Sequence, residues 1–156
     1  ESYARDQIRA HITANFKGHE FTRLVDEVLK AQGYHTKRMP PGPDGGVDIL
    51  AGSGPMGFET PRLAVQVKSS ESPENVNTLR ELQGIMKTFS AQQGLLVSWG
   101  GFKETVYREA RPLFFELRLW DADDFLAALL GHYDKLDDTL QAELPLKRVW
   151  TLVLED

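Results

Sequence analysis

The clearest hydrophobic pattern in this chain is a helical stripe in its first third. Apolar side chains recur at i, i+3, i+4, i+7 and i+8, the spacing that lines one face of an α-helix. Gly33 follows the stripe as a stop signal, so we predict a helix over residues 19–32 and a shorter one before it over residues 6–15. The stripe consists of Phe21, Leu24, Val25, Val28 and Leu29.

A second pattern has a period of two and predicts a strand over residues 62–69. Leu63, Val65 and Val67 are apolar, and they alternate with positions that include Gln66 and Lys68. Because successive strand residues point to opposite faces, Gln66 and Lys68 share a face and lie roughly 6.6 Å apart along the strand.

Strands and helices then alternate through the rest of the chain. Ser72-Pro73 resembles a helix start, followed by inward positions at 79, 82, 85, 86 and 89, and Asp121 is a predicted N-cap. This order predicts an α/β fold in which a mixed sheet carries helices on both faces. The remaining predicted elements are strands at 34–39, 47–51, 94–98, 115–120 and 148–154, helices at 103–111, 121–130 and 137–144, a Gly/Pro-rich turn at 40–46 and a loop at 52–61.

The composition indicates one globular domain, because 156 residues with 41% hydrophobic content can bury a substantial core. No run approaches the roughly 18 apolar residues of a membrane span, and no signal-peptide pattern heads the sequence. Cysteine is absent, which excludes disulfides, thiolate zinc sites and cysteine nucleophiles and makes the cytoplasm the expected location. The first residue is Glu1 rather than Met, so we expect a fragment of a longer protein.

The net charge of −5 argues against a nucleic-acid partner, but the charge is unevenly distributed. Residues 1–120 hold 15 Lys/Arg and 14 Asp/Glu, whereas the acidic C-terminal extension, residues 121–156, holds 3 and 9. Residues 1–120 are therefore close to neutral, but they do not form a basic domain. Strong DNA affinity would therefore require local clustering or an additional DNA-recognition domain elsewhere in the protein.

One acidic residue interrupts an apolar strand. Asp48 lies in the predicted strand 47–51, where an unpaired carboxylate carries a desolvation cost. If this strand pairs with residues 62–69, Asp48 meets Gln66 and Lys68. Carboxylate and amide oxygens suit a hard cation, and the lysine can support a nucleophile or developing charge, so the grouping predicts metal-assisted attack of water on a phosphodiester. On pattern alone, a hairpin-end Asp48 beside a solvated strand face is an equally simple interpretation.

Longer segments carry a family resemblance that reaches from about residue 15 to residue 125. In this order they resemble the Mrr-type restriction endonuclease catalytic domain, a branch of the PD-(D/E)xK nuclease superfamily with a Gln-x-Lys variant motif. The resemblance implies a three-layer α/β/α restriction-endonuclease-like core, Mg²⁺ with Mn²⁺ as a substitute, and hydrolysis of DNA. The segments are GHEF (18–21), GPDGGVD (42–48), VQVK (65–68), LQG (82–84) and GLLVSWGGF (94–102).

The resemblance also implies roles for individual residues. Asp48 takes the place of the metal-binding acid, Gln66 that of the second acid and Lys68 that of the lysine, and we expect the Val67 carbonyl to help position the metal. Gln66 departs from the acid of the wider superfamily. An amide oxygen adds no charge, so the metal is expected to be held less tightly while staying more electrophilic.

Two further groups each have two interpretations. Glu20 shares a helix face with Leu24 and Val28, so it could point to the core side and complete the metal site through water, as in resembling proteins. It could equally be a first-turn glutamate favoured by the helix dipole. Arg80 and Lys87 could follow a DNA phosphate track, although a solvated helix face explains them more simply.

The sequence as a whole predicts a metal-dependent DNA endonuclease domain of Mrr type, from a prokaryotic restriction or defence protein. Cutting both strands requires two sites, so we expect a homodimer or a dimer driven by double-stranded DNA. The alternative, which the low basic charge favours, is a non-catalytic interaction or sensing module that keeps the same fold.

Overall fold

The computed structural model of the chain describes residues 2–40 and 46–154. Residues 41–45, which make up most of the predicted turn at 40–46, lie outside the described residues. Two short 3-10 turns, Arg111–Leu113 and Tyr133–Lys135, accompany the main elements. The helices are α1 (Ser2–Asn15), α2 (His19–Ala31), α3 (Val76–Thr88), α4 (Glu104–Ala110), α5 (Ala122–Gly131) and α6 (Asp138–Glu143), and the strands are β1 (His35–Arg38), β2 (Ile49–Ser53), β3 (Glu59–Lys68), β4 (Gln93–Ser98) and β5 (Leu117–Trp120).

The strands form one mixed sheet in the order β1-β2-β3-β4-β5. The pairs β1–β2 and β2–β3 are antiparallel, whereas β3–β4 and β4–β5 are parallel. Helices α3 and α4 connect β3 to β4 and β4 to β5. Such helical crossovers allow parallel pairing, because they return the chain to the end of the sheet where the previous strand began. The predicted mixed sheet is therefore confirmed.

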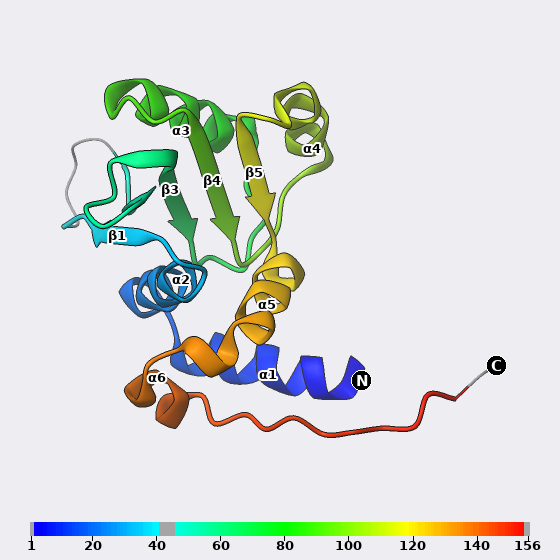
Figure 1. Ribbon diagram of the computed structural model, residues 1–156. Coiled ribbons are helices and arrows are strands. Elements are labelled where there is room, and N and C mark those ends of the chain that lie inside the picture. The colour runs from blue at the N-terminus through cyan, green and yellow to red at the C-terminus, as the bar shows by residue number, and fades with distance from the viewer. Residues whose placement is uncertain (1, 41–45, 155–156) are drawn as a thin grey trace.

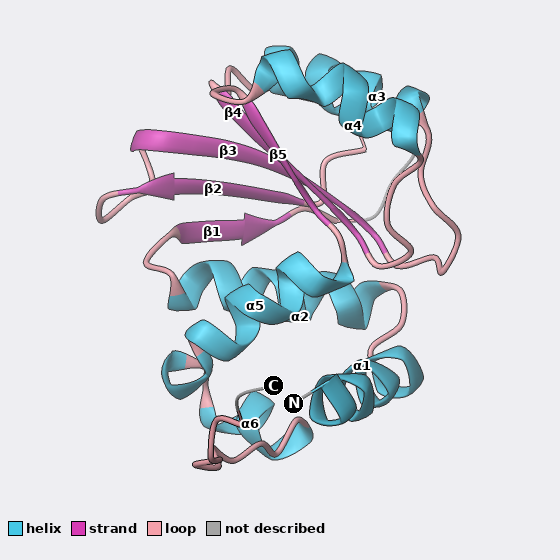
Figure 2. Ribbon diagram, turned by 90° about the vertical axis from the view of Figure 1, so that its right-hand side faces the viewer, coloured by secondary structure: helices cyan, strands magenta, loops and turns pink. Residues whose placement is uncertain are grey.

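Helices cover both faces of the sheet, as the three-layer prediction requires (Figure 2). On one face lie α3 and α4; on the other lie α2 and α5, with α1 and α6 packed beyond them (Figures 1 and 2). Separate apolar clusters fill the two sides. The stripe predicted for α2 belongs to the larger cluster, and all five of its residues are at most 1% exposed.

Helix α3 starts later than predicted, because Asn75 rather than Ser72 is its N-cap. The Asn75 side chain accepts a hydrogen bond from the backbone N–H of Asn77 at 2.9 Å. Glu74 is held in an extended conformation, since its N–H donates to the Gly101 carbonyl and its carbonyl accepts from Lys103 N–H, both at 3.0 Å. These two hydrogen bonds form a β-bridge between Glu74 and Phe102, so the helix can begin only after Glu74.

The final strand predicted over residues 148–154 is wrong. That segment is an extended, exposed stretch beyond α6 that carries no strand (Figure 1). Trp150 is 101% exposed, and the neighbouring apolar residues are at least 67% exposed. An apolar, β-prone sequence becomes a strand only where a neighbouring strand supplies hydrogen bonds, and here none of the described strands does.

Other elements differ from the predictions only at their ends. Strand β3 begins at Glu59, inside the predicted loop, and β2 begins at Ile49 rather than at Val47. Asp121 caps α5 through a reciprocal capping box with Asp124, as predicted for the cap. None of the described helices is long and apolar enough to cross a membrane.

Candidate active site

The three residues of the predicted site line one open cavity of about 580 Å³. Asp48 lies immediately before β2, and Gln66 and Lys68 lie at the carboxyl end of β3. Strands β2 and β3 pair Ile49 with Val65, which sets Asp48 beside Gln66. Helix α3 provides another wall through Glu81, Gly84 and Thr88. The pairing on which the sequence argument depended is therefore present.

Asp48 is fixed to β3 by two hydrogen bonds. Its backbone N–H donates to the Val65 carbonyl at 3.0 Å, and its Oδ2 accepts the Val67 N–H at 2.7 Å. The N–H and C=O of one strand residue point to the same side, so the Val67 carbonyl faces the side of β3 on which Asp48 lies. The carboxylate is thus held by the backbone of the strand that carries Gln66 and Lys68.

Burial raises the pKa of Asp48 above its usual value. The Val67 hydrogen bond and the electrostatic effects of Lys68 and His19 lower the pKa of Asp48 without cancelling the effect of burial. Asp48 is therefore a carboxylate whose charge the folded protein does not fully compensate. A bound cation would supply the missing compensation.

We expect Asp48→Asn to stabilise the protein at neutral pH in the absence of divalent cations. A raised pKa means that the folded protein binds the proton more tightly than the unfolded chain, so wild-type stability falls as the pH rises above the ordinary Asp value of 3.8. Asparagine has no charge to desolvate, and its amide oxygen can still accept the Val67 N–H. Thermal unfolding should show a higher Tm for the variant at pH 7, with the difference shrinking at about pH 3. An equal or lower Tm at pH 7 would show that the folded protein already compensates the charge.

Gln66 is almost fully buried, with 3% of its surface exposed. Its Nε2 donates to Glu81 Oε2 over a long distance of 3.4 Å, while its Oε1 is buried without a partner among the described residues. Gly46, which has a positive φ of 62°, lies against the amide, and a Cβ added there would come within 3.4 Å of Gln66 Nε2. The amide is therefore confined, and its oxygen forms no hydrogen bond with the described residues.

These oxygens suit a magnesium ion. Mg²⁺ usually binds one or two carboxylates and completes its shell with water and substrate phosphates, so it needs no all-protein cage. Asp48, the unpartnered Gln66 Oε1 and the Val67 carbonyl provide such a partial set. Within residues 2–40 and 46–154, no group of three or more His, Cys, Asp or Glu side chains could hold a metal by itself. A cation here would accordingly depend on the amide and on oxygens from substrate or water.

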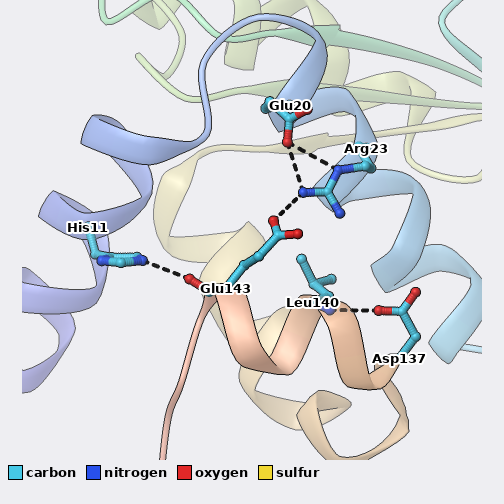
Figure 3. Close-up of polar contacts among 6 residues, drawn as sticks. All are labelled: His11, Glu20, Arg23, Asp137, Leu140 and Glu143. Carbon is cyan, nitrogen blue, oxygen red and sulfur yellow. Dashed lines mark hydrogen bonds and ion pairs between the residues drawn. The ribbon is translucent and has the colours of Figure 1, made fainter.

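The structure does not bring Glu20 to this cavity. Its side chain is exposed, which disagrees with the core-side interpretation of Glu20 and agrees with the alternative of a glutamate in the first turn of the helix. Its Oε2 accepts two hydrogen bonds from Arg23 at 2.8 and 3.1 Å (Figure 3). Arg23 also pairs with Glu143 of α6, so the guanidinium lies between two carboxylates (Figure 3). The helix start itself is close to β3, because Gly18 N–H donates to Ser69 Oγ at 3.3 Å. The Glu20 carboxylate, however, serves the contact between α2 and α6.

Arg80 and Lys87 lie outside the cavity lining as well. Arg80 forms an ion pair with Glu109 of α4 at 2.9 Å, which offsets its charge locally. Lys87 is exposed on another face of α3, beside Gln83 and Met86. Neither residue is placed with Asp48, and their predicted contacts with DNA remain predictions.

Four residues near the site were assigned no role from the sequence. Glu81, Gly84 and Thr88 were assigned no role, because the interpretation of this helix weighed only Arg80 and Lys87 as possible DNA contacts. The spacing of Glu81, Gly84 and Thr88 at i, i+3 and i+7 was the signal that could have identified the cavity face. His19 affects the charge of Asp48 from the start of α2, and no spacing in the sequence indicates this.

The comparisons with known proteins agree with the observed fold. In fold the chain is similar to the DNA modification-dependent restriction endonuclease AspBHI, with a TM-score of 0.67 and 18% identity over 90% of this chain and 38% of that one. It is also similar to the MspJI restriction endonuclease, solved in complex with a 27-mer oligonucleotide, with a TM-score of 0.51 and 18% identity over 90% of this chain and 32% of that one. The chain thus spans about a third of the length of these relatives.

No curated protein matches the sequence. The family model Mrr_cat, described as a restriction endonuclease, matches residues 13–129. This match covers most of the chain, including Asp48, Gln66 and Lys68. The chain therefore belongs to the Mrr_cat family of restriction endonuclease domains.

Proposed function

We propose that this domain is a Mg²⁺-dependent endonuclease that hydrolyses phosphodiester bonds of double-stranded DNA in a restriction or defence system. The convergence of Asp48, Gln66 and Lys68 on one cavity, in a chain of the restriction endonuclease family, carries the proposal. The oligonucleotide bound by MspJI and the DNA modification on which AspBHI depends are properties of those proteins. They support DNA as the substrate class of this chain.

Four residues of the cavity have distinct roles in this proposed reaction. Asp48 and Gln66 Oε1, with the Val67 carbonyl, would hold the cation. When bound, Mg²⁺ would favour the ionisation of water and stabilise negative charge on the phosphate. Lys68 offers three N–H donors, which would orient the attacking water and hold a phosphate oxygen. Water forms the new P–O bond, the P–O bond opposite breaks, one water proton is released and the leaving oxygen takes up a proton.

Two features of the assembly belong to the same proposal. A single cavity cuts one strand, so cleavage of both strands would use two copies of the domain, either as a homodimer or as copies paired on DNA. The part of the chain before residue 121 is close to neutral, which supports recognition of DNA by an additional domain.

Plasmid nicking with different divalent cations tests the proposed reaction. We expect cleavage with Mg²⁺ or Mn²⁺ and none with excess EDTA. Ca²⁺ should bind without supporting turnover, because it is larger and less demanding in geometry. The matched control is Lys37→Met, a lysine on strand β1 away from the cavity, which should cut like the wild type. Cleavage that continues in EDTA would contradict the metal dependence, and no cleavage with any cation would favour the non-catalytic module.

A further inference from the structure

Glu81 is the acidic residue of α3 that lines the cavity, and none of the roles described so far involves it. It lies on the cavity wall with Gly84 and Thr88, one and two turns further along the helix. Its Oε2 accepts a hydrogen bond from Gln66 Nε2 at 3.4 Å. The carboxylate of the helix thus contacts the amide that stands in the second acid's place.

This contact determines which end of the Gln66 amide faces the carboxylate. A carboxylate only accepts hydrogen bonds, so the amide must offer its NH₂ group to Glu81 and turn its carbonyl oxygen away. The oxygen turned away is Oε1, which is buried without a partner among the described residues. A buried acceptor in this state is unfavourable unless a ligand satisfies it. The amide is therefore held with a buried, unpartnered oxygen on a residue that lines the cavity of the proposed metal site.

We propose that Glu81 is a positioning residue that holds the Gln66 amide so that Oε1, rather than Nε2, is presented to a divalent cation. The inference rests on the proposed function, because it takes Gln66 as a cation ligand. Rotation of the amide by half a turn would place NH₂ hydrogens where the cation needs an oxygen. Glu81 is itself exposed, so water and salt screen the direct effect of its charge, and its influence passes through the amide.

A double-mutant cycle on Ca²⁺ affinity tests this role without relying on cleavage. Calorimetry would compare the wild type with Glu81→Gln, Gln66→Ala and the double variant. Glutamine at position 81 can donate as well as accept, so it no longer selects one orientation of the Gln66 amide. We expect each single variant to bind Ca²⁺ roughly 10-fold or more weakly, and the double variant to bind about as weakly as Gln66→Ala alone. Glu104→Gln, which removes a charge from the start of α4 outside the cavity, should retain wild-type affinity.

A second measurement keeps the test decisive if Gln66→Ala fails to fold. In the metal-free protein, Glu81→Gln should shift the side-chain NH₂ signals of Gln66 in ¹H–¹⁵N spectra, whereas Glu104→Gln should leave them unchanged. Wild-type Ca²⁺ affinity in Glu81→Gln would overturn the inference. So would additive losses in the double variant, because Glu81 would then act independently of Gln66. If the wild type itself binds no divalent cation, the proposed function fails instead.

Discussion

Replacing Lys68 by methionine is expected to reduce DNA cleavage roughly 100-fold or more while leaving the protein folded. Positively charged donors aimed at developing negative charge commonly contribute this much to catalysis. Methionine keeps much of the aliphatic bulk of the half-buried side chain and removes only its charge and its donors. The measurement is the single-turnover nicking rate with saturating Mg²⁺, accompanied by thermal unfolding to confirm the fold.

Lys37→Met is the matched control for this result, since it removes a lysine from an exposed edge strand. If Lys68→Met cleaves at the wild-type rate, the lysine is only a residue at the end of a strand. The cavity would then lack the group proposed to orient the attacking water, and its assignment as the catalytic centre would be weakened. A loss of activity accompanied by a clear decrease in Tm would indicate a structural role for Lys68 instead.

Phe125→Ala is expected to lower the free energy of unfolding by about 3–5 kcal/mol. Phe125 of α5 is fully buried and packs edge-on against Phe21 of α2, with ring centroids 5.2 Å apart. Phe21 in turn packs against Trp99 at 5.3 Å, so the three rings join both helices to the end of β4. Truncation would leave a cavity at the centre of this cluster, and the loss would be a large part of the stability of a typical domain.

Urea unfolding measures this loss, and Phe115→Ala is its control. Phe115 is 87% exposed in the turn before β5, so its truncation should change stability by no more than about 0.5 kcal/mol. Similar losses for the two variants would mean that the aromatic cluster does not organise this side of the core.

The sequence predicted the elements well where one periodicity dominated. The α2 stripe corresponds to the observed burial, because the helix packs one apolar face against the sheet. Residues 62–69 do form a strand, but their alternation does not reappear in the burial of β3: Ala64, Val65 and Gln66 are all buried, because helices cover both faces of the sheet. The prediction was wrong at residues 148–154, where composition favours a strand but no described neighbour pairs with it. Strand formation depends on a partner distant in sequence, which local pattern does not contain.

The same limit explains which parts of the site could be predicted. The sequence predicted that Asp48, Gln66 and Lys68 lie together, because the strand with Asp48 was expected to pair with the next strand, on which Gln66 and Lys68 share a face. The spacing of Glu81, Gly84 and Thr88 marks one face of α3, but the contact of Glu81 with Gln66 also depends on how α3 is rotated against the sheet, which the spacing does not contain. The core-side interpretation of Glu20 came from helix phase alone, and the phase could not reveal that Glu20 pairs with Arg23, which also pairs with Glu143.

The hairpin between β2 and β3 makes this domain convenient for fluorescent labelling. Strand β2 leads away from Asp48 for five residues, roughly 17 Å, before the chain turns back along β3. Met56 in that turn is 67% exposed and does not line the cavity. The sequence contains no cysteine, so Met56→Cys would introduce a single thiol. A dye attached there could report the arrival of DNA by energy transfer while leaving every proposed catalytic group unmodified.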